Sequence, residues 1–374
     1  MLTYLGNKRK LLKSITDIVS KIGTDLKVLD AFSGSGVVAR ALVPFSKEVH
    51  ANDWEPYSYA QARCFIEKPS PEDQEKIREL VAAMNALDFT EEGIVCQNYA
   101  PKDSNDIQMG ERCFFTRENA LRIDTMRKFI SEQPEHIQPY LLAPLLIKAS
   151  VHTNTSGQFQ AFHKNREGRG AWGGEFGSSL SRITGLIKPD APIFSSHDYR
   201  GYAYNLDVFR CLETFPDNHL DVIYLDPPYN HRQYSYLYFL LNIIATNEMP
   251  AVVTDTAGAT DPKLRNASEF CMKNKVVAAF SKLLQMCTQK SKVTILSYSN
   301  ESIVKPEEMN KIMEPYQVDI HIQNHSRYNV RGDEHTRDAV KTTEEFLYVI
   351  SAPVKSSDRS VVAVVDGTSQ SSHR

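Results

Sequence analysis

The sequence predicts an α/β fold, a doubly wound, Rossmann-like parallel sheet that is interrupted along the chain by a mostly helical insertion. Residues 27–53 have the pattern strand, glycine turn, helix, strand, which is a βαβ unit. Alternating strand and helix patterns return from about residue 205 and include a strongly apolar strand at 221–226. Residues 67–204 show helical periodicity without this alternation. The sheet is therefore expected to be built from two separate stretches of chain.

The composition of the 374 residues indicates a folded, enzyme-sized protein. With 41% hydrophobic and 24% charged residues, the chain can bury a large core. The net charge of -3 excludes a uniformly basic surface, so any contact with nucleic acid must come from a local basic cluster. The longest apolar stretches are well short of the roughly 20 residues of a membrane helix, and no signal-peptide core follows residues 8–10. We expect a cytoplasmic protein without membrane contact.

The six cysteines are scattered, with no CxxC pair and no histidine at ligand spacing. Reduced, buried thiols are expected from this pattern rather than a disulfide framework or structural zinc, and no metal is expected.

The predicted elements follow in order from local patterns. Apolar residues from Leu11 to Ile22 recur at helical spacing, and Gly23 ends that helix. A strand is expected at 27–31, a helix at 37–43 stopped by Pro44, and a strand at 48–51. The other expected helices are 72–87, 121–132, 140–151, 208–214, 234–246 and 273–290, and the other expected strands are 221–226, 293–297, 318–322 and 346–350. These elements divide the chain into residues 1–66 and 205–352 as two parts of one sheet domain, an inserted domain at 67–204, and a Ser-rich, disordered tail at 353–374.

The first motif that carries chemistry is a glycine turn from Asp30 to Ala39, with Gly34 and Gly36. Glycines at the carboxyl end of a strand let the backbone turn tightly and approach a ligand. As GxGxxA it also suits the pyrophosphate loop of a dinucleotide enzyme. Asp53, at the end of the next strand, is placed to accept ribose hydroxyls; alternatively it is a helix N-cap ahead of Pro56.

The second motif is Asp226-Pro227-Pro228-Tyr229, directly after the apolar strand. The two prolines stiffen the turn and hold a carboxylate, a backbone carbonyl and an aromatic ring in fixed geometry. An exocyclic amine needs two acceptors to fix its hydrogens, and a planar base needs a face on which to stack. Asp-Pro-Pro-Tyr downstream of a glycine loop therefore indicates chemistry on the amine of a base.

With these motifs the chain resembles the amino-methyltransferases that act on DNA adenine with S-adenosylmethionine, and most closely the D12 class (Dam-like, alpha group, with a DPPY motif). The matching stretches occur in that group's order: 4–12, 30–36, 52–53, a long insertion, 205–207, 226–229 and 297–300. Asn7 departs from the pattern, because glycine is commoner there. The resemblance implies an S-adenosylmethionine-dependent methyltransferase sheet with an inserted target-recognition domain.

The resemblance also implies roles for residues around the cofactor. Tyr4 would pack against it and Lys8 would hold its carboxylate; as an alternative, Lys8 belongs to a solvated basic cluster. The turn from Asp30, with Phe32, Gly34 and Gly36, would line the methionine end, and Asp53 would take the ribose hydroxyls. Asp207 would read the cofactor adenine, or else cap the following helix.

For the reaction, the resemblance implies that the target adenine flips out of the duplex and stacks on Tyr229. Asp226, which also borders the cofactor, and the carbonyl of Pro227 would accept from its amine, without a metal or a covalent intermediate. Aspartate rather than serine at 226 favours adenine over cytosine. The implied partners are double-stranded DNA and, functionally, a cognate restriction endonuclease.

The insertion contains a basic stretch at 157–188, with five basic and two acidic residues. Lys164, Arg166 and Arg169 lie there among Gln, Asn and Trp, and Arg, Gln and Asn are the side chains that pair with base edges. We predict DNA contact by these three residues, against the alternative of a solvated loop. Arg327, Arg331 and Arg337 form a second candidate that nearby acidic residues almost neutralise.

Three other functions remain open at this stage. An RNA adenine or protein amide methyltransferase usually carries Asn at position 226. A NAD-dependent dehydrogenase would explain the glycine turn and Asp53 but leaves Asp226 to Tyr229 without a role. A methylase-like DNA-binding protein without activity is disfavoured by the intact Asp226 and Tyr229.

Overall fold

Eight strands form one sheet in the order β3-β2-β1-β4-β5-β7-β6-β8. The structure is a computed structural model and describes residues 2, 8–249, 257–259, 265–326, 342–353 and 362–364. The strands are β1 (Leu26–Asp30), β2 (Ser46–Asn52), β3 (Arg200–Tyr204), β4 (Leu220–Leu225), β5 (Ser291–Ser299), β6 (Tyr316–Ser326), β7 (Thr342–Pro353) and β8 (Val362–Val364). The strands from β3 to β5 pair in parallel, and β7 pairs antiparallel with both β5 and β6. The predicted doubly wound sheet is confirmed.

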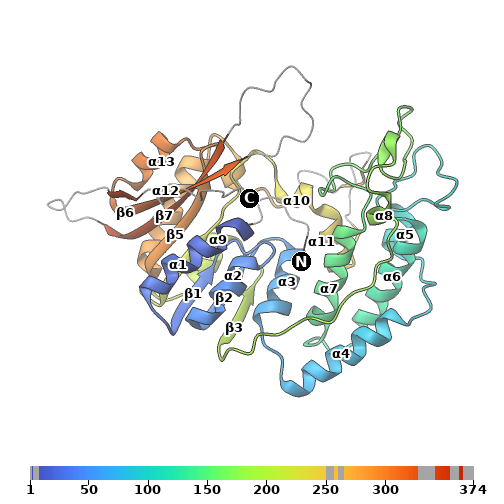
Figure 1. Cartoon of the computed structure of the whole chain (residues 1–374), viewed down its shortest axis with the longest axis horizontal. Helices are drawn as coiled ribbons and strands as arrows, with labels where there is room; N and C mark the ends of the chain where they lie inside the picture. The colour runs from blue at the N-terminus through green and yellow to red at the C-terminus, as the bar shows by residue number, and fades with distance from the viewer. Residues whose placement is uncertain are drawn as a thin grey trace, which may run out of the picture.

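Helices cover both faces of this sheet (Figure 1). The helices α1 (Leu12–Ile22), α2 (Val37–Leu42) and α3 (Pro56–Ile66) pack on one face around the side chains of Val28, Val49 and Val222. The helices α9 (Val208–Glu213), α12 (Val276–Lys290) and α13 (Pro306–Met313) pack on the other, around Leu29 and Ile223. Successive side chains of a strand point to opposite faces, so neighbouring residues such as Val28 and Leu29 serve different layers.

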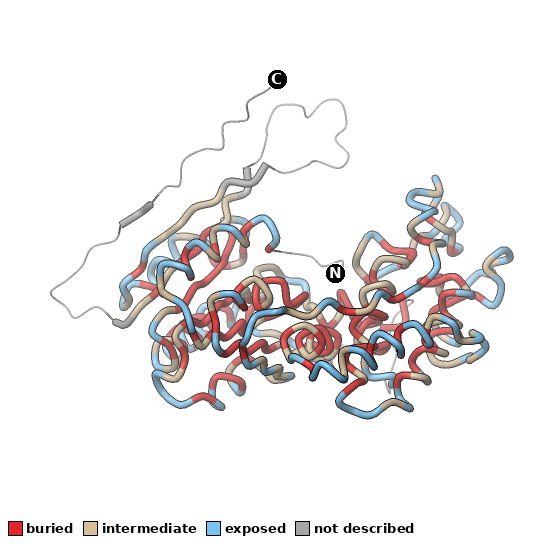
Figure 2. The backbone as a smooth tube through the Cα atoms, turned by 60° about the horizontal axis from the view of Figure 1, so that its bottom comes forward, coloured by how far each residue is buried: buried red, intermediate tan, exposed pale blue. Residues whose placement is uncertain are grey.

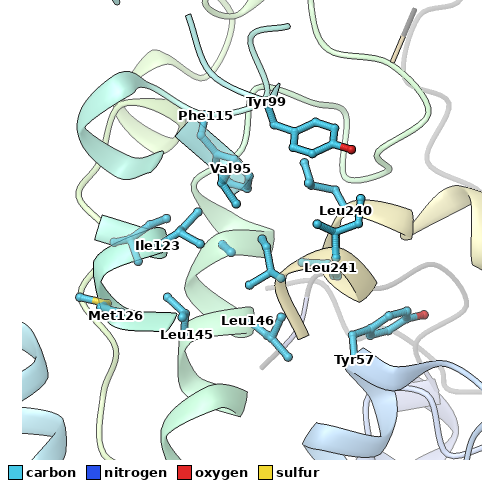
Figure 3. Packing of buried hydrophobic residues seen from close by; sticks show 14 of the residues in the cluster. Tyr57, Val95, Tyr99, Phe115, Ile123, Met126, Leu145, Leu146, Leu240 and Leu241 are labelled. Carbon is cyan, nitrogen blue, oxygen red and sulfur yellow. The ribbon is translucent and has the colours of Figure 1, made fainter. Parts of the chain in front are cut away.

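The segment between α3 and β3 forms a second, helical body with its own core. Its helices are α4 (Pro71–Asn85), α5 (Ile94–Asn98), α6 (Arg117–Ser131), α7 (Gln138–Val151) and α8 (Leu180–Ile183). Figure 3 shows the packing of this core, in which Tyr57 of α3 and Leu240 and Leu241 lie beside residues of the insertion. In Figure 2 buried residues run through the middle of both bodies and exposed residues lie outside.

Leu240 and Leu241 belong to α11 (Phe239–Thr246), which follows β4 in sequence. The predicted helix at 234–246 is in fact two helices, α10 (Tyr234–Leu237) and α11, because the backbone leaves helical geometry at Tyr238. The Tyr238 ring is buried against Tyr57, Phe159 and Tyr234. Helix α11 therefore joins the sheet part of the chain to the core of the insertion.

Two predicted boundaries differ from the structure. The sheet resumes at Arg200 rather than 205, because β3 pairs with β2; β3 was missed since its half-exposed residues form no apolar run. The tail expected to be disordered from 353 contributes β8, where paired valines favour a strand, and β8 pairs in parallel with β6. The other residues beyond Pro353 lie outside the described part of the chain.

Candidate active site

The glycine turn joins the end of β1 to α2 and has the backbone that its sequence predicts. Gly34 and Gly36 have φ angles of 50° and 73°, a left-handed region that glycine adopts without the clash of a Cβ atom. Asp30 ends β1, and its Oδ2 accepts from the Ala39 N–H at 3.0 Å, which holds the first turn of α2 against the strand. Its other oxygen, Oδ1, is buried and has no hydrogen-bond partner among the described residues. Burial raises the pKa of Asp30 to about 8.

Asp53 follows β2 at the same edge of the sheet. Its Oδ2 accepts from the Gly34 N–H at 2.7 Å and its Oδ1 from the Glu55 N–H at 2.9 Å. Burial raises the pKa of Asp53 to about 6, although these backbone bonds oppose the shift. The N-cap of α3 is Glu55, so Asp53 organises the turn ahead of that helix without being its N-cap.

A cavity of about 360 Å³ opens beside these residues and continues to the Asp226 turn. Asp53, Asp207 and Asp226 line it together with Phe32 and Pro228. The Asp207 side chain accepts from the Phe209 N–H at 2.9 Å, so it caps α9 and also borders the cavity. Both alternatives for Asp207 therefore agree with its position.

Other walls of the cavity were not found from the sequence. Trp54, Glu55, Gln233 and Phe270 line it, and the Phe270 ring packs edge-on against Phe32 with centroids 5.5 Å apart. The Gln233 amide bonds both backbone groups of Ser268, which closes the segment 265–271 over the cavity. No motif marks these residues, because they come together only when the segment folds back onto the sheet.

The cavity is acidic. Five carboxyl groups line it, those of Asp53, Glu55, Asp207, Asp226 and Glu269. The described residues that line it include no lysine or arginine. Burial raises the pKa of Glu55 to about 8, so this carboxyl is mostly protonated at neutral pH. The other carboxylates repel the anionic pyrophosphate of a dinucleotide and favour a cationic ligand. The cavity therefore fits a positively charged cofactor better than NAD.

The Asp226 turn follows β4, which pairs with β1 at the point where the strand order reverses direction. The Tyr229 carbonyl accepts from the Ile303 N–H at 3.0 Å, which ties the turn to the loop after β5. Burial is the largest influence on the Asp226 carboxyl and raises its pKa to about 6.

Lys8 is buried beside this turn and is 5% exposed, so the alternative of a solvated basic cluster is wrong for this residue. Its Nζ lies 3.0 Å from Asp226 Oδ1 and 5.1 Å from the centroid of the Tyr229 ring. Burial alone would lower the pKa of Lys8, but the nearby carboxylates outweigh it and raise the pKa. Lys8 also lines a small recess with Asp30 and Gly34.

Residues 164–170, within the basic stretch of the insertion, form a tight hairpin closed by a bridge between Lys164 and Gly170. Lys164, Arg166 and Arg169 are exposed on it. Arg166 pairs with Glu175, with Nε and Oε1 3.2 Å apart. Arg182, counted in the same stretch, instead donates to the carbonyls of three residues at and just after the end of α7: Val151, Thr153 and Thr155.

The insertion also contacts the segment that follows the Asp226 turn and helix α10 after it. Arg232 donates to the Gln158 side chain at 3.2 Å, and the Phe159 N–H donates to the Leu237 carbonyl at 2.7 Å. These bonds fix the segment that leads to the hairpin next to the end of the turn.

Some predictions fall outside the described residues, namely Tyr4, Arg327, Arg331 and Arg337. All six cysteines are buried and free. Within the described ranges, no group of His, Cys, Asp or Glu side chains has the arrangement of a metal site. None of the helices in that part of the chain is long and apolar enough to cross a bilayer.

A doubly wound sheet with an acidic cavity and an Asp-Pro-Pro-Tyr turn at its switch point defines a Rossmann-like methyltransferase. Residues 4–172 and 194–312 match the model of the D12 class N6 adenine-specific DNA methyltransferases, and the chain belongs to that family. It is therefore an adenine-specific DNA methyltransferase, which excludes the dehydrogenase and the RNA or protein amide methyltransferases considered from the sequence.

Individual relatives can be aligned with most of the length of this chain. It is 28% identical to the Type II methyltransferase M.CviAII of Paramecium bursaria Chlorella virus 1 over 93% of this chain and 97% of that protein. It is 28% identical to the Type II methyltransferase M.NlaIII of Neisseria lactamica over 93% and 99%. The modification methylase StsI of Streptococcus sanguinis is 29% identical over 84% of this chain but only 46% of its own length.

Proposed function

We propose that this protein transfers a methyl group from S-adenosylmethionine to the N6 amine of an adenine flipped out of duplex DNA. The observation that carries the proposal is the place of the Asp226 turn, which borders the acidic cavity on one side and buried Lys8 on the other. A carboxylate, a carbonyl and an aromatic ring thus meet beside a cavity suited to a cationic cofactor.

The residues around the cavity fit S-adenosylmethionine, which supplies a methyl group on a positively charged sulfur. Asp53 lies where it can accept from ribose hydroxyls, and Phe32 and Phe270 offer apolar faces. The Oδ1 of Asp30 is a buried oxygen without a hydrogen bond from any described residue, and an ammonium group in the neighbouring recess would stabilise the ionised carboxylate against the burial that raises its pKa. Lys8, in the same recess, would hold the cofactor carboxylate.

The chain's own residues prepare the adenine. Tyr229 provides the stacking face for the flipped base. Asp226 and the Pro227 carbonyl accept from the N6 amine and hold its lone pair toward the cavity. Asp226, with its pKa raised to about 6, then accepts the proton that the amine loses once the new N–C bond forms.

The hairpin from Lys164 to Gly170 is the part of the insertion that we place on DNA. Its exposed cations would contact phosphates or base edges. The bonds of Gln158 to Arg232 and of Phe159 to Leu237 hold the start of the hairpin beside the segment that follows the Asp226 turn. Target recognition and methyl transfer would then share one DNA-binding face, formed by the inserted domain and the carboxyl edge of the sheet.

The printed names of the relatives extend the proposal to a biological role. Two of them are called Type II methyltransferases and one a modification methylase. We place this protein likewise as the modification enzyme of a restriction-modification system, acting on cellular DNA in the cytoplasm. A cognate restriction endonuclease is its functional partner in this proposal.

The test is methylation-sensitive sequencing of DNA from a methylase-free host that expresses the chain. N6-methyladenine at one sequence context is expected, and the Asp226→Ala variant serves as the control because its cavity walls are otherwise intact. Methylation of cytosine, or equal methylation in both strains, would overturn the proposal.

A further inference from the structure

A second carboxylate stands beside Lys8. Glu345 lies on β7, more than a hundred residues after the Asp226 turn, and its Oε2 is 4.0 Å from Lys8 Nζ. Its side chain is 15% exposed, and Oε2 is buried without a hydrogen bond from any described residue. Lys8 therefore lies between two carboxylates, at 3.0 Å from one and 4.0 Å from the other.

The pairing of β7 places Glu345 there. Its antiparallel register with β5 sets Glu345 opposite Ser299, at the carboxyl edge of the sheet where β4 delivers Asp226. Adjacent residues of a strand face opposite sides, so Glu344 points away from Lys8. The backbone of Glu344 instead bonds the N–H and the side chain of Asn300.

If Asp226 were the one carboxylate beside Lys8, the arrangement would be unfavourable for catalysis. In the proposed function Asp226 must accept from the adenine amine, and an ammonium ion bound only to Asp226 would withdraw electron density from it and compete for its oxygens. A second carboxylate gives Lys8 another attachment. Removing the charge of Glu345 should therefore tighten the pair between Lys8 and Asp226.

We propose that Glu345 is a positioning residue, which shares the Lys8 ammonium with Asp226 so that the Asp226 carboxylate keeps the capacity to accept from the adenine amine. The inference rests on the proposed function of Asp226. It adds a residue from the distant β7 strand to the site.

The charged groups around Asp226 determine in which direction the pKa of Asp226 should move when Glu345 is changed. The titratable groups that interact with the Asp226 carboxyl come from several elements: Lys8, Asp30, Tyr224, Tyr229, Tyr234 and Glu345. Within this set Lys8 lowers the pKa of Asp226, whereas the like charge of Glu345 raises it. Glu345→Gln is thus expected to move the acid limb of the rate profile to lower pH while turnover falls.

The experiment compares Glu345→Gln, Glu345→Asp and the matched control Glu344→Gln on the same strand. Single-turnover methylation of cognate duplex is measured across the acid and neutral pH range, with cofactor and DNA affinities and thermal midpoints. For Glu345→Gln we expect turnover on the order of 10- to 100-fold below wild type, an acid limb at lower pH, and little change in DNA affinity. Glu345→Asp should lie between, and Glu344→Gln should match wild type.

Two outcomes overturn the inference: Glu345→Gln behaving as Glu344→Gln, or a loss of turnover without movement of the acid limb, which indicates a structural role only. If Glu345→Gln does not fold, Glu345→Asp decides, and wild-type turnover in it overturns the inference. Asp226→Asn in the same assay separates a failure of the proposed function from a failure of the inference about Glu345. Wild-type turnover in Asp226→Asn refutes the proposed role of Asp226. Loss of turnover in Asp226→Asn, together with wild-type behaviour of the Glu345 variants, refutes only the role of Glu345.

Discussion

The Gly34 N–H donates to the Asp53 carboxylate at 2.7 Å, a bond that joins the turn after β1 to the residue that follows β2. One side chain thus sets the backbone of the glycine turn and also forms part of the cavity wall. The same carboxylate accepts from the Glu55 N–H, so two backbone donors fix its position before any ligand arrives. Such preorganisation lowers the cost of binding.

Asp53→Ala should weaken cofactor affinity about 10- to 100-fold, since hydrogen bonds to charged groups contribute about 1.5–3 kcal/mol. DNA affinity should be unchanged, because Asp53 lies in the cavity wall and is not part of the basic hairpin. Isothermal titration with S-adenosylmethionine measures the first quantity and duplex binding the second. Unchanged cofactor affinity would remove Asp53 from the binding site.

Asp226→Ala should abolish most methyl transfer, with a loss of about 10²–10³ in rate, as for other preorganised polar groups. The fold should persist, because Pro227 and Pro228 restrict the turn and the Tyr229 carbonyl keeps its bond to the Ile303 N–H. Radiolabelled methyl transfer and a thermal melt test the two statements. Near wild-type turnover in the folded variant would contradict the assignment.

The rate should also depend on pH through Asp226. Its pKa is raised to about 6, and only the ionised carboxylate accepts from the amine without donating a proton. Turnover at saturating substrates should therefore fall as the pH drops through this pKa and level off above it. The Asp226→Asn variant is the control, because its residual rate should lack this limb; a limb of equal position in both would assign the titration to another group.

Tyr229→Ala should lower activity through lost stacking of about 1–3 kcal/mol per base, whereas Tyr229→Phe should be milder. The phenyl ring of the second variant retains both the stacking face and the contact with the Lys8 ammonium. Fluorescence of 2-aminopurine at the target position reports base flipping separately from chemistry. Equal losses in both variants would point to the hydroxyl group instead of the ring.

Local motifs allowed much of the site to be predicted, and residues outside them could not be. Asp226 and Tyr229 share one turn, and Asp30 and Gly34 share another, so each pair can be recognised from a few consecutive residues. Glu345 reaches Lys8 only through the pairing of β7 with β5, which no local pattern specifies.

The same limit applies to the fold. The strands β1 and β4 were predicted because they are apolar runs, whereas β3 was missed because an edge strand is half exposed. The break at Tyr238 depends on aromatic partners such as Phe159 of the insertion, which is distant in sequence. Long-range packing thus decided the features that periodicity did not reveal.

The hairpin of the insertion gives the last prediction. Lys164→Ala, Arg166→Ala and Arg169→Ala should each weaken DNA binding, because all three side chains are exposed on one tight turn. A phosphate contact should weaken binding to every sequence and reduce the salt slope by about one. A base contact should cost about 1–3 kcal/mol and relax the preference at one base pair.

The pair between Arg166 and Glu175 does not prevent such contact, because the Arg166 side chain is 80% exposed and surface ion pairs contribute little. Cofactor affinity should stay constant in all three variants, since none of these residues lines the cavity. Lys13→Ala on α1 is the matched control, because Lys13 is a similarly exposed cation that pairs with Asp17 at 2.6 Å. Affinities at two salt concentrations, on cognate and scrambled duplexes, separate the cases. Three variants with the affinity and salt slope of Lys13→Ala would exclude the hairpin from the DNA interface and direct the search to α4 and α6.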